Sequence, residues 1–128
     1  MTSITGRDAG KGGPLPLAGV RVLDVSHIVA GPFCSAILAD YGADVIKVEQ
    51  PGKGDRARGV APFVTRGQTR VSGFFATVNR NRRGVALDLK SAAGKEVFRK
   101  LVSASDVLIE NFSPGTMDRL GLGHEELR

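Results

Sequence analysis

His27 and Cys34 are the side chains of this sequence that most resemble a catalytic pair. Histidine acts as a general base near neutral pH, and a nearby base activates a thiol as a nucleophile. Cys34 is the only cysteine, and it falls on the first turn of a helix that we expect to begin at Pro32. Free thiols of this kind are mostly packed or semi-buried, and a histidine after a strand is mostly structural. From the residues alone, we therefore expect a packed Cys34 and a structural His27.

Arginine is concentrated in the middle of the chain, and the formal net charge is +5 at pH 7. Arginine binds phosphate groups through two parallel hydrogen bonds, so such a cluster indicates a ligand with several phosphates. The alternative is a solvated basic surface. Nucleic acid is not expected, because aromatic residues make up 5% of the chain and do not alternate with basic ones. The cluster consists of Arg56, Arg58, Arg66, Arg70, Arg80, Arg82 and Arg83.

Other common site chemistries do not fit the sequence. The chain has 2 histidines and 1 cysteine without clustered carboxylates, so we predict no metal site. The stretch from Gly6 to Lys11 resembles a phosphate-binding loop, but no strand precedes it and Gly12 stands where Ser or Thr is required. The first strand–helix turn lacks the Gly-x-Gly-x-x-Gly pattern, which argues against NAD, although Glu49 stands where a ribose-binding carboxylate would.

The residues around His27 follow a pattern typical of a β-α-β unit. Residues 20–25 are a short run rich in branched apolar residues, which predicts a buried parallel strand. Pro32 suits the first position of a helix, because its missing N–H would have no partner there. Gly42 is the expected left-handed helix cap, and residues 45–48 predict the return strand. The helix is expected to bury one apolar face made of Phe33, Ile37, Leu38 and Tyr41.

The rest of the chain alternates helices and strands after a long segment rich in Gly, Arg and Pro. This segment, residues 52–72, predicts a loop with or without a short helix. Ser91 is the expected N-cap of a later helix. That helix is expected to bury Val97, Phe98, Leu101 and Val102. The other expected elements are a helix over 73–78, a strand over 85–89, a strand over 107–109 and a helical turn over 117–120.

These elements predict an α/β fold, a Rossmann-like open parallel sheet with flanking helices. Ligands of such sheets bind outside the carboxyl ends of the strands. His27 follows the first expected strand, and Asn111 and Phe112 follow the last. Phe112 either stacks on an adenine and lines a cleft or plugs the core, and the residues leave both alternatives open. We expect Asp24 to organise the first turn and Asp40 the helix end.

A series of short motifs also carries a resemblance to one protein family. The motifs are residues 16–24, Ala30-Gly31-Pro32, residues 38–43 and 45–49, Gly54-Asp55, and residues 79–83, 87–90, 106–115 and 120–122. Any one of them is weak, but their order and spacing over residues 15–128 are specific. The chain resembles the family III CoA-transferases, which include formyl-CoA transferase, the carnitine CoA-transferase type and α-methylacyl-CoA racemase.

The resemblance implies the N-terminal portion of an enzyme that moves CoA between an acyl-CoA thioester and a carboxylic acid. In the family, an aspartate carboxylate attacks the thioester to give a mixed anhydride, and an aspartyl-CoA thioester then passes CoA to the second acid. That aspartate is expected beyond residue 128, so no catalytic residue is assigned within this chain and the chain alone is expected to be inactive. Two alternatives stay open: an α-methylacyl-CoA racemase of the same fold, and a non-catalytic, truncated CoA-binding fragment.

The resemblance also implies which residues contact CoA, and it moves His27 from a structural role to a role at the ligand. One departure is Gln50, where some members have a basic residue that holds the CoA phosphates, and Arg56 or Arg58 is expected to substitute for it. Another departure is Val29, where formyl-CoA transferase has a glutamine that helps to hold oxalate, which argues against oxalate as acceptor. The implied CoA contacts are His27, Ile28, Leu87, Lys90, Asn111, Phe112, Arg119 and Leu120.

The chain is expected to contain two parts. Residues 1–14 are Gly-rich and polar and predict a disordered leader, and residues 15–128 predict the truncated N-terminal part of a CoA-binding α/β domain. No apolar run approaches the roughly 20 residues of a membrane-spanning helix, so no membrane partner is expected. A single cysteine excludes an internal disulfide and favours the cytoplasm. The resemblance implies a full-length homodimer that takes acyl-CoA and a carboxylic acid as substrates, without a tightly bound cofactor.

Overall fold

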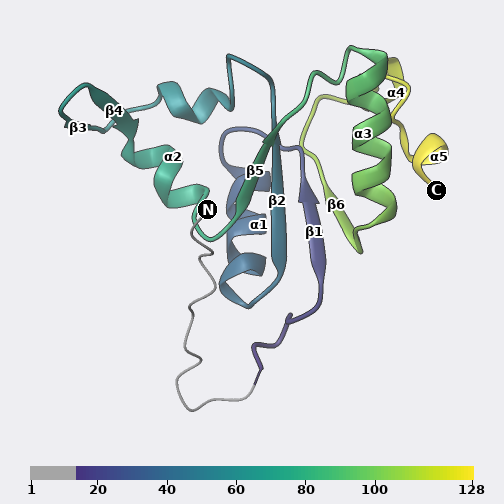
Figure 1. The fold of residues 1–128 in the computed structure, drawn as a ribbon, viewed down its shortest axis with the longest axis horizontal. Helices are drawn as coiled ribbons and strands as arrows, with labels where there is room; N and C mark the ends of the chain where they lie inside the picture. Colours follow the sequence, from purple (N-terminus) through teal and green to yellow (C-terminus); the bar gives the residue numbers. More distant parts are fainter. Residues whose placement is uncertain (1–13) are drawn as a thin grey trace, which may run out of the picture.

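In residues 14–128, the part of the chain that the computed structural model describes, four parallel strands form a central sheet (Figure 1). The leader expected over residues 1–14 lies, apart from Pro14, outside the described residues. The strand order is β5-β2-β1-β6, and every neighbouring pair is parallel. The expected open parallel sheet is therefore confirmed. The strands are β1 (Arg21–Asp24), β2 (Asp44–Glu49), β5 (Arg83–Ala86) and β6 (Val107–Ile109).

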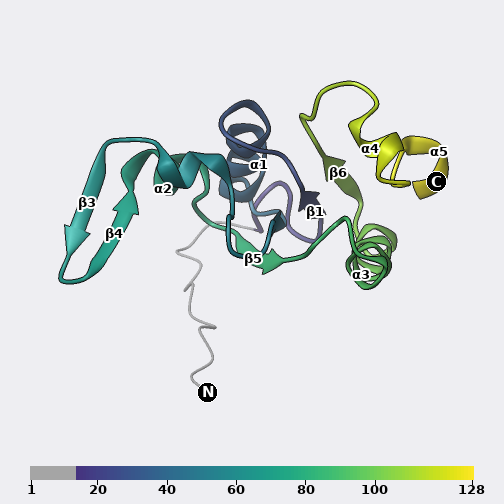
Figure 2. The ribbon, with the colours of Figure 1, turned by 90° about the horizontal axis from the view of Figure 1, so that it is seen from above.

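Helices cover both faces of the sheet (Figure 2). Successive side chains of a strand point to opposite faces, so neighbours on β1 enter different halves of the core. Val22 packs with Ala39 of α1 (Ala30–Asp40), whereas Leu23 packs with Phe98 of α3 (Ala92–Ser103). Val22, Leu23 and Phe98 are completely buried. The β1-α1-β2 unit expected from the sequence is thus the centre of the fold.

Small side chains join α1 to the sheet. Its buried residues are Gly31, Pro32, Ser35, Ala36 and Ala39. Of the apolar face expected from the sequence, Leu38 packs against the core, but the expectation is wrong for Phe33, Ile37 and Tyr41, which are 49%, 37% and 54% exposed. Small residues let the helix backbone lie close to the sheet, and this turns the large side chains outward. Pro32 is the third helical residue instead of the first, but it still needs no intrahelical partner for its nitrogen.

The segment expected as a loop over residues 52–72 contains a β-hairpin, which the sequence analysis missed. The two strands pair antiparallel, with Val64 opposite Val71, and Gly67 in the turn has a φ of +60°. The hairpin projects away from the central sheet beside α2 (Figure 2). The helix expected over 73–78 is confirmed. The elements of this region are the 3-10 helix η1 (Arg56–Gly59), β3 (Phe63–Arg66), β4 (Thr69–Ser72) and α2 (Gly73–Val78).

Ser91 caps α3 as expected, because its Oγ accepts the N–H of Gly94 at 3.0 Å. Gly94 itself lies against the preceding connection, where a Cβ at this position would stand 2.0 Å from the carbonyl oxygen of Asp88. Phe98 is buried, but Val97 is 42% exposed and does not belong to the buried stripe. The capped first turn of α3 therefore packs tightly against the chain that leads into it.

The connection between β5 and α3 is longer than expected. The strand expected over 85–89 ends at Ala86, which leaves Leu87–Lys90 outside the sheet at the carboxyl end of β5. The strand expected over 107–109 is confirmed as β6. Two four-residue helices follow it, α4 (Thr116–Arg119) and α5 (His124–Leu127). No helix among residues 14–128 has both the length and the apolar character needed to cross a bilayer.

Candidate functional site

Two adjoining cavities open at the carboxyl ends of the central strands. The smaller has a volume of about 170 Å³ and is mainly apolar, and the larger, of about 810 Å³, carries Lys53 and Arg56. Both are lined by His27, Gln50 and Phe112, so these side chains stand between them. The other residues of the smaller cavity are Val25, Val48, Glu49, Leu87, Asp88, Leu89, Lys90 and Leu120. Those of the larger are Ile28, Val29, Ala30, Gly54, Asn111, Ser113 and Thr116.

The loop after β1 forms the wall between the cavities. The His27 N–H donates to Asn111 Oδ1 at 2.8 Å, and Asn111 Nδ2 donates back to the His27 carbonyl at 2.9 Å. The His27 ring meets Phe112 edge to face, with 5.2 Å between ring centroids. Ile28 has a φ of +69°, which is rare for a β-branched residue, and its N–H donates to Asp55 Oδ1 at 3.0 Å. Side chains from two other segments therefore hold this backbone in place.

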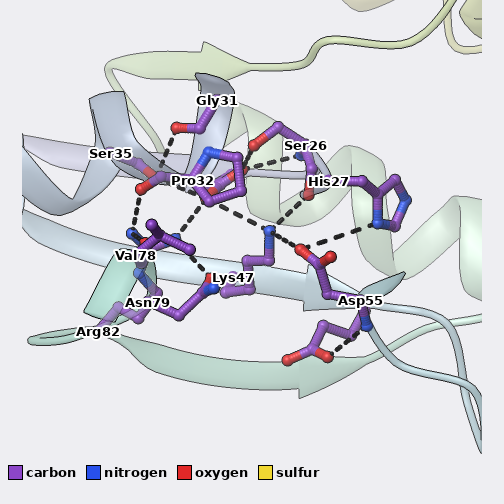
Figure 3. A network of polar contacts seen from close by, with 12 residues as sticks. Ser26, His27, Gly31, Pro32, Ser35, Lys47, Asp55, Val78, Asn79 and Arg82 are labelled. Carbon is purple, nitrogen blue, oxygen red and sulfur yellow. Dashed lines mark hydrogen bonds and ion pairs between the residues drawn. The ribbon is translucent and has the colours of Figure 1, made fainter. Parts of the chain in front are cut away.

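Beneath the loop lies a network of buried charges, here called the Lys47 network and made of Asp24, Lys47, Asp55 and Arg82. Figure 3 labels the last three of these residues. Asp24, Lys47 and Asp55 are at most 1% exposed. Lys47 Nζ lies 2.9 Å from Asp55 Oδ2 and 3.7 Å from Asp24 Oδ2, and it donates to the Ser26 carbonyl. Arg82 Nη1 is 2.6 Å from Asp24 Oδ2. The network balances its charges, which is the condition for burying them at tolerable cost.

Asp55 is ionised and His27 is neutral at pH 7. Burial disfavours the Asp55 carboxylate, but the N–H groups of Ala57 and Ile28 and the Lys47 ammonium outweigh it and hold the pKa of Asp55 below its usual value. Burial lowers the pKa of His27, and the nearby Asp55 charge offsets this only in part. His27 Nδ1 lies 4.0 Å from Asp55 Oδ2. The two side chains thus face each other as an uncharged ring and a carboxylate.

Most residues expected to contact CoA lie around the two cavities. His27, Leu87, Lys90, Phe112 and Leu120 line the smaller one, and Ile28 and Asn111 line the larger. Asn111 uses its amide on the His27 backbone, so its place in the site is that of a loop support. Arg119 lines neither cavity, and its Nη2 donates to the Thr116 hydroxyl at 2.9 Å. The structure brings together seven of the eight expected contacts.

The arginine cluster is largely paired with carboxylates. Arg58 donates to both oxygens of Glu49 at 2.7 Å and lies over the Phe75 ring at 3.8 Å, outside both cavities. Arg56 lines the larger cavity. Two arginines, Arg56 and Arg58, are expected at phosphate groups. Arg56 lies at one of the two cavities, and Arg58 lies at neither. The other paired members are Arg80 with Asp40, Arg82 with Asp24, and Arg83 with Asp44.

Sequence reasoning missed Lys53, which lines the larger cavity beside Arg56. The pairing of Lys47 with Asp55 was not predicted either, although both residues lie in the family motifs, at residues 45–49 and 54–55. The available signal was Lys47 itself, because a lysine inside a strand expected to be buried requires an anionic partner. Cys34 is exposed, so the expectation of a packed thiol is wrong. Among residues 14–128, no group of three or more His, Cys, Asp or Glu side chains is placed to hold a metal ion.

Known proteins resemble this chain in sequence and in fold. The chain is 46% identical to formyl-CoA:oxalate CoA-transferase of Afipia carboxidovorans and 47% identical to succinyl-CoA:mesaconate CoA-transferase of Haloarcula hispanica. These alignments include 88% and 85% of this chain but 26% and 28% of the relatives, so the chain spans about a quarter of their length. The crystal structure of a CAIB/BAIF family protein from Brucella suis matches with a TM-score of 0.83 and 40% identity, over 90% of this chain and 30% of that one.

The match extends to a model of a whole family. Residues 17–128, almost all of the part that the structure describes, fit the model of CoA-transferase family III. The chain therefore belongs to CoA-transferase family III.

Proposed function

We propose that this chain is the N-terminal, CoA-binding portion of an acyl-CoA:carboxylate CoA-transferase. The observation that carries the proposal is the pair of adjoining cavities, one apolar and one basic, at the carboxyl ends of the parallel strands. A ligand with an aromatic base at one end and phosphates beside it matches such a pair. The relatives named above are CoA-transferases, which favours acyl exchange over racemisation.

In this proposal, the adenine of CoA enters the smaller cavity beside Phe112, and its phosphates lie in the larger one. Lys53 and Arg56 line that cavity, and residues 14–128 offer neither of them a carboxylate within ion-pair distance. Both cations are thus available to phosphate oxygens, which arginine binds through two hydrogen bonds and lysine as a point charge. We assign Arg58 no phosphate in this proposal, because its guanidinium already donates to both carboxylate oxygens of Glu49.

The covalent chemistry is assigned to the remainder of the full-length protein. We place the nucleophilic aspartate beyond residue 128 and no catalytic residue within this chain, so the chain alone is inactive. The two substrates are then an acyl-CoA and a carboxylic acid. No tightly bound cofactor takes part in the proposed reaction. A homodimer and a cytoplasmic location complete the proposal. They rest on the resemblance and on the single cysteine.

CoA is expected to bind the full-length protein much more tightly than NAD does, and the affinity is expected to fall with added salt. Solvent-exposed ion pairs are screened within about 10 Å at 0.1 M ionic strength, so the phosphate contacts weaken as salt rises. Isothermal titration of CoA and NAD at two salt concentrations measures both effects. Equal affinity for the two ligands would contradict the proposal.

Variants of the larger cavity sharpen this experiment. Arg56→Ala and Lys53→Ala are expected to weaken CoA binding and to reduce its salt dependence, because each removes a charge that faces the phosphates. Arg66→Ala is the matched control, since Arg66 lies at the end of β3 on the hairpin, away from both cavities. If all three variants bound CoA alike, the phosphates would have to lie elsewhere.

Phe112→Ala is expected to weaken CoA binding by about 1–3 kcal/mol through lost stacking and burial. Phe112 is half-buried, lines both cavities and also packs against the core, so a smaller loss of stability accompanies the loss of affinity. Titration calorimetry and thermal melting of the same variant separate the two effects. A loss of stability with unchanged affinity would assign Phe112 to the core alone.

A further inference from the structure

Asp55 is a buried carboxylate whose two oxygens have different neighbours. Its Oδ1 accepts the N–H groups of Ile28 at 3.0 Å and Ala57 at 2.8 Å. Its Oδ2 lies 2.9 Å from Lys47 Nζ and 4.0 Å from His27 Nδ1. One oxygen therefore holds the backbone of two segments, the loop after β1 and η1, and the other lies between a cation and the His27 ring.

The His27 ring presents its two nitrogens to different surroundings. Nδ1 is buried and has no hydrogen-bond partner among residues 14–128, and Figure 3 shows it directed at Asp55. The opposite side of the ring points away from Asp55 (Figure 3), and His27 lines both cavities. A carboxylate accepts hydrogen bonds and donates none. A proton on Nδ1 is the only choice that lets Nδ1 and Asp55 interact favourably.

The gap of 4.0 Å between His27 Nδ1 and Asp55 Oδ2 is longer than a hydrogen bond. At this distance the carboxylate charge still favours a proton on the facing nitrogen, and a shift of about 1 Å would form the hydrogen bond. The other charged groups near the ring are Lys47 of β2, Arg56 of η1 and Asp24 of β1. Lys47 is held by Asp55 and by the Ser26 carbonyl, so it does not compete for the ring.

We propose that Asp55, held by Lys47, is a positioning residue that selects the Nδ1–H tautomer of His27 and presents the Nε2 lone pair to the ligand cleft as a hydrogen-bond acceptor. The ligand group that fits this acceptor is an amide N–H or an aromatic amine. CoA carries groups of both kinds, so the role of Nε2 toward the ligand rests on the proposed function. The tautomer itself does not, because it is set by Asp55 before any ligand binds.

The tautomer is measured by two-bond ¹H–¹⁵N correlation spectra of the ¹⁵N-labelled full-length protein, at about pH 8, where histidine is neutral. His27 is assigned from the spectrum of a His27→Gln variant. The expected result is a protonated Nδ1 and an unprotonated Nε2 at His27. The Nε2–H tautomer in the unaltered protein would overturn the proposal whatever the variants do.

Asp55→Asn tests the cause of this preference. The asparagine keeps an oxygen for the N–H groups of Ile28 and Ala57, but its amide donates toward His27 Nδ1, so the tautomer is expected to change to Nε2–H. Asp44→Asn is the matched control, because Asp44 pairs with Arg21 and Arg83 and lines neither cavity of the site. A folded Asp55→Asn protein that keeps the original tautomer would also overturn the proposal.

Titration with CoA separates the two proposals. CoA binding is expected to shift the His27 Nε2 resonance, and Asp55→Asn is expected to weaken CoA about three- to tenfold, the loss of one hydrogen bond. If calorimetry shows CoA binding while the Nε2 resonance stays in place, the acceptor role is wrong although the function stands. If CoA does not bind, the proposed function fails, and the tautomer measurement still decides the role of Asp55.

Discussion

Lys47→Met is expected to lower the free energy of unfolding by about 3–5 kcal/mol, because it leaves the buried Asp55 carboxylate without its cation. Lys47 is 1% exposed and lies 2.9 Å from Asp55, which is also 1% exposed. Methionine preserves much of the volume, so the change reports on charge more than on packing. Urea unfolding of the purified full-length protein, followed by circular dichroism, measures the loss.

Lys100→Met is the matched control for this substitution. Lys100 also forms an ion pair, with Glu96 at 2.7 Å, but the two side chains are 73% and 68% exposed. Exposed pairs of this kind contribute about 0.5 kcal/mol or less. A Lys47 variant as stable as the Lys100 variant would show that the Lys47 network is not the buried support described above.

The effect of Lys47→Met is also expected to depend on pH. The pKa of Asp55 is lower in the folded protein than in the unfolded chain. Ionised Asp55 therefore stabilises the fold at pH values above the ordinary carboxyl pKa, and this stabilisation is lost as the pH falls through the lower pKa of the folded state. The difference in the free energy of unfolding between the original protein and the Lys47→Met variant is therefore expected to be largest at neutral pH and to decrease below about pH 4. Urea unfolding at a series of pH values tests this direction.

Gly94→Ala is expected to destabilise the protein by about 3 kcal/mol, although alanine ordinarily stabilises a helix by about 1 kcal/mol relative to glycine. The added Cβ would lie 2.0 Å from the Asp88 carbonyl oxygen and 2.7 Å from its carbon, and these are backbone atoms. Relief requires that Leu87–Lys90 move, and this segment lines the smaller cavity. We therefore expect a lower melting temperature in thermal melting and a weaker CoA affinity in titration.

Gly59→Ala is the appropriate comparison for that variant. Gly59 ends η1, and a Cβ there would meet no atom within 4 Å. Its melting temperature and CoA affinity are expected to stay close to those of the original protein. An equal effect of the two substitutions would mean that the contact between Gly94 and Asp88 is not as tight as described.

The elements that could be predicted are those fixed by neighbours in sequence. The β1-α1-β2 unit, the Ser91 cap and the short helix over 73–78 follow from local patterns of branched residues, caps and glycine. The hairpin around Gly67 could not be predicted because each of its strands has four residues and a single valine, and the threonine and arginine beside it show no alternation of apolar and polar side chains. Its strands are stabilised by pairing with each other and by rings such as Phe63 under Arg70.

The buried face of α1 could not be predicted from periodicity alone. Ser35 and Ala39 repeat with the same spacing as Phe33 and Ile37, so the helix has two candidate faces. The small residues are the ones that allow close packing on the sheet, and only the tertiary structure decides between the two. Periodicity therefore predicts the wrong orientation for a helix that carries large side chains on its outer surface.

The candidate site was predictable where strand ends bring residues together. His27 and Phe112 follow β1 and β6, which are neighbours in the sheet, and their rings are in contact. The pairing of arginines was not predictable, because Arg58 and Arg82 meet Glu49 and Asp24 only through the folded chain. Lys53 lacked any local pattern that would distinguish it from a solvated surface lysine.

Ile28 has a consequence for the energetics of ligand binding. Its φ of +69° is a conformation that glycine adopts freely and a β-branched residue avoids. The hydrogen bond from its N–H to Asp55 keeps this backbone in place, so the loop is ordered when the protein folds and not when the ligand arrives. A preorganised wall leaves less conformational entropy to be lost on association, and affinity gains by that amount.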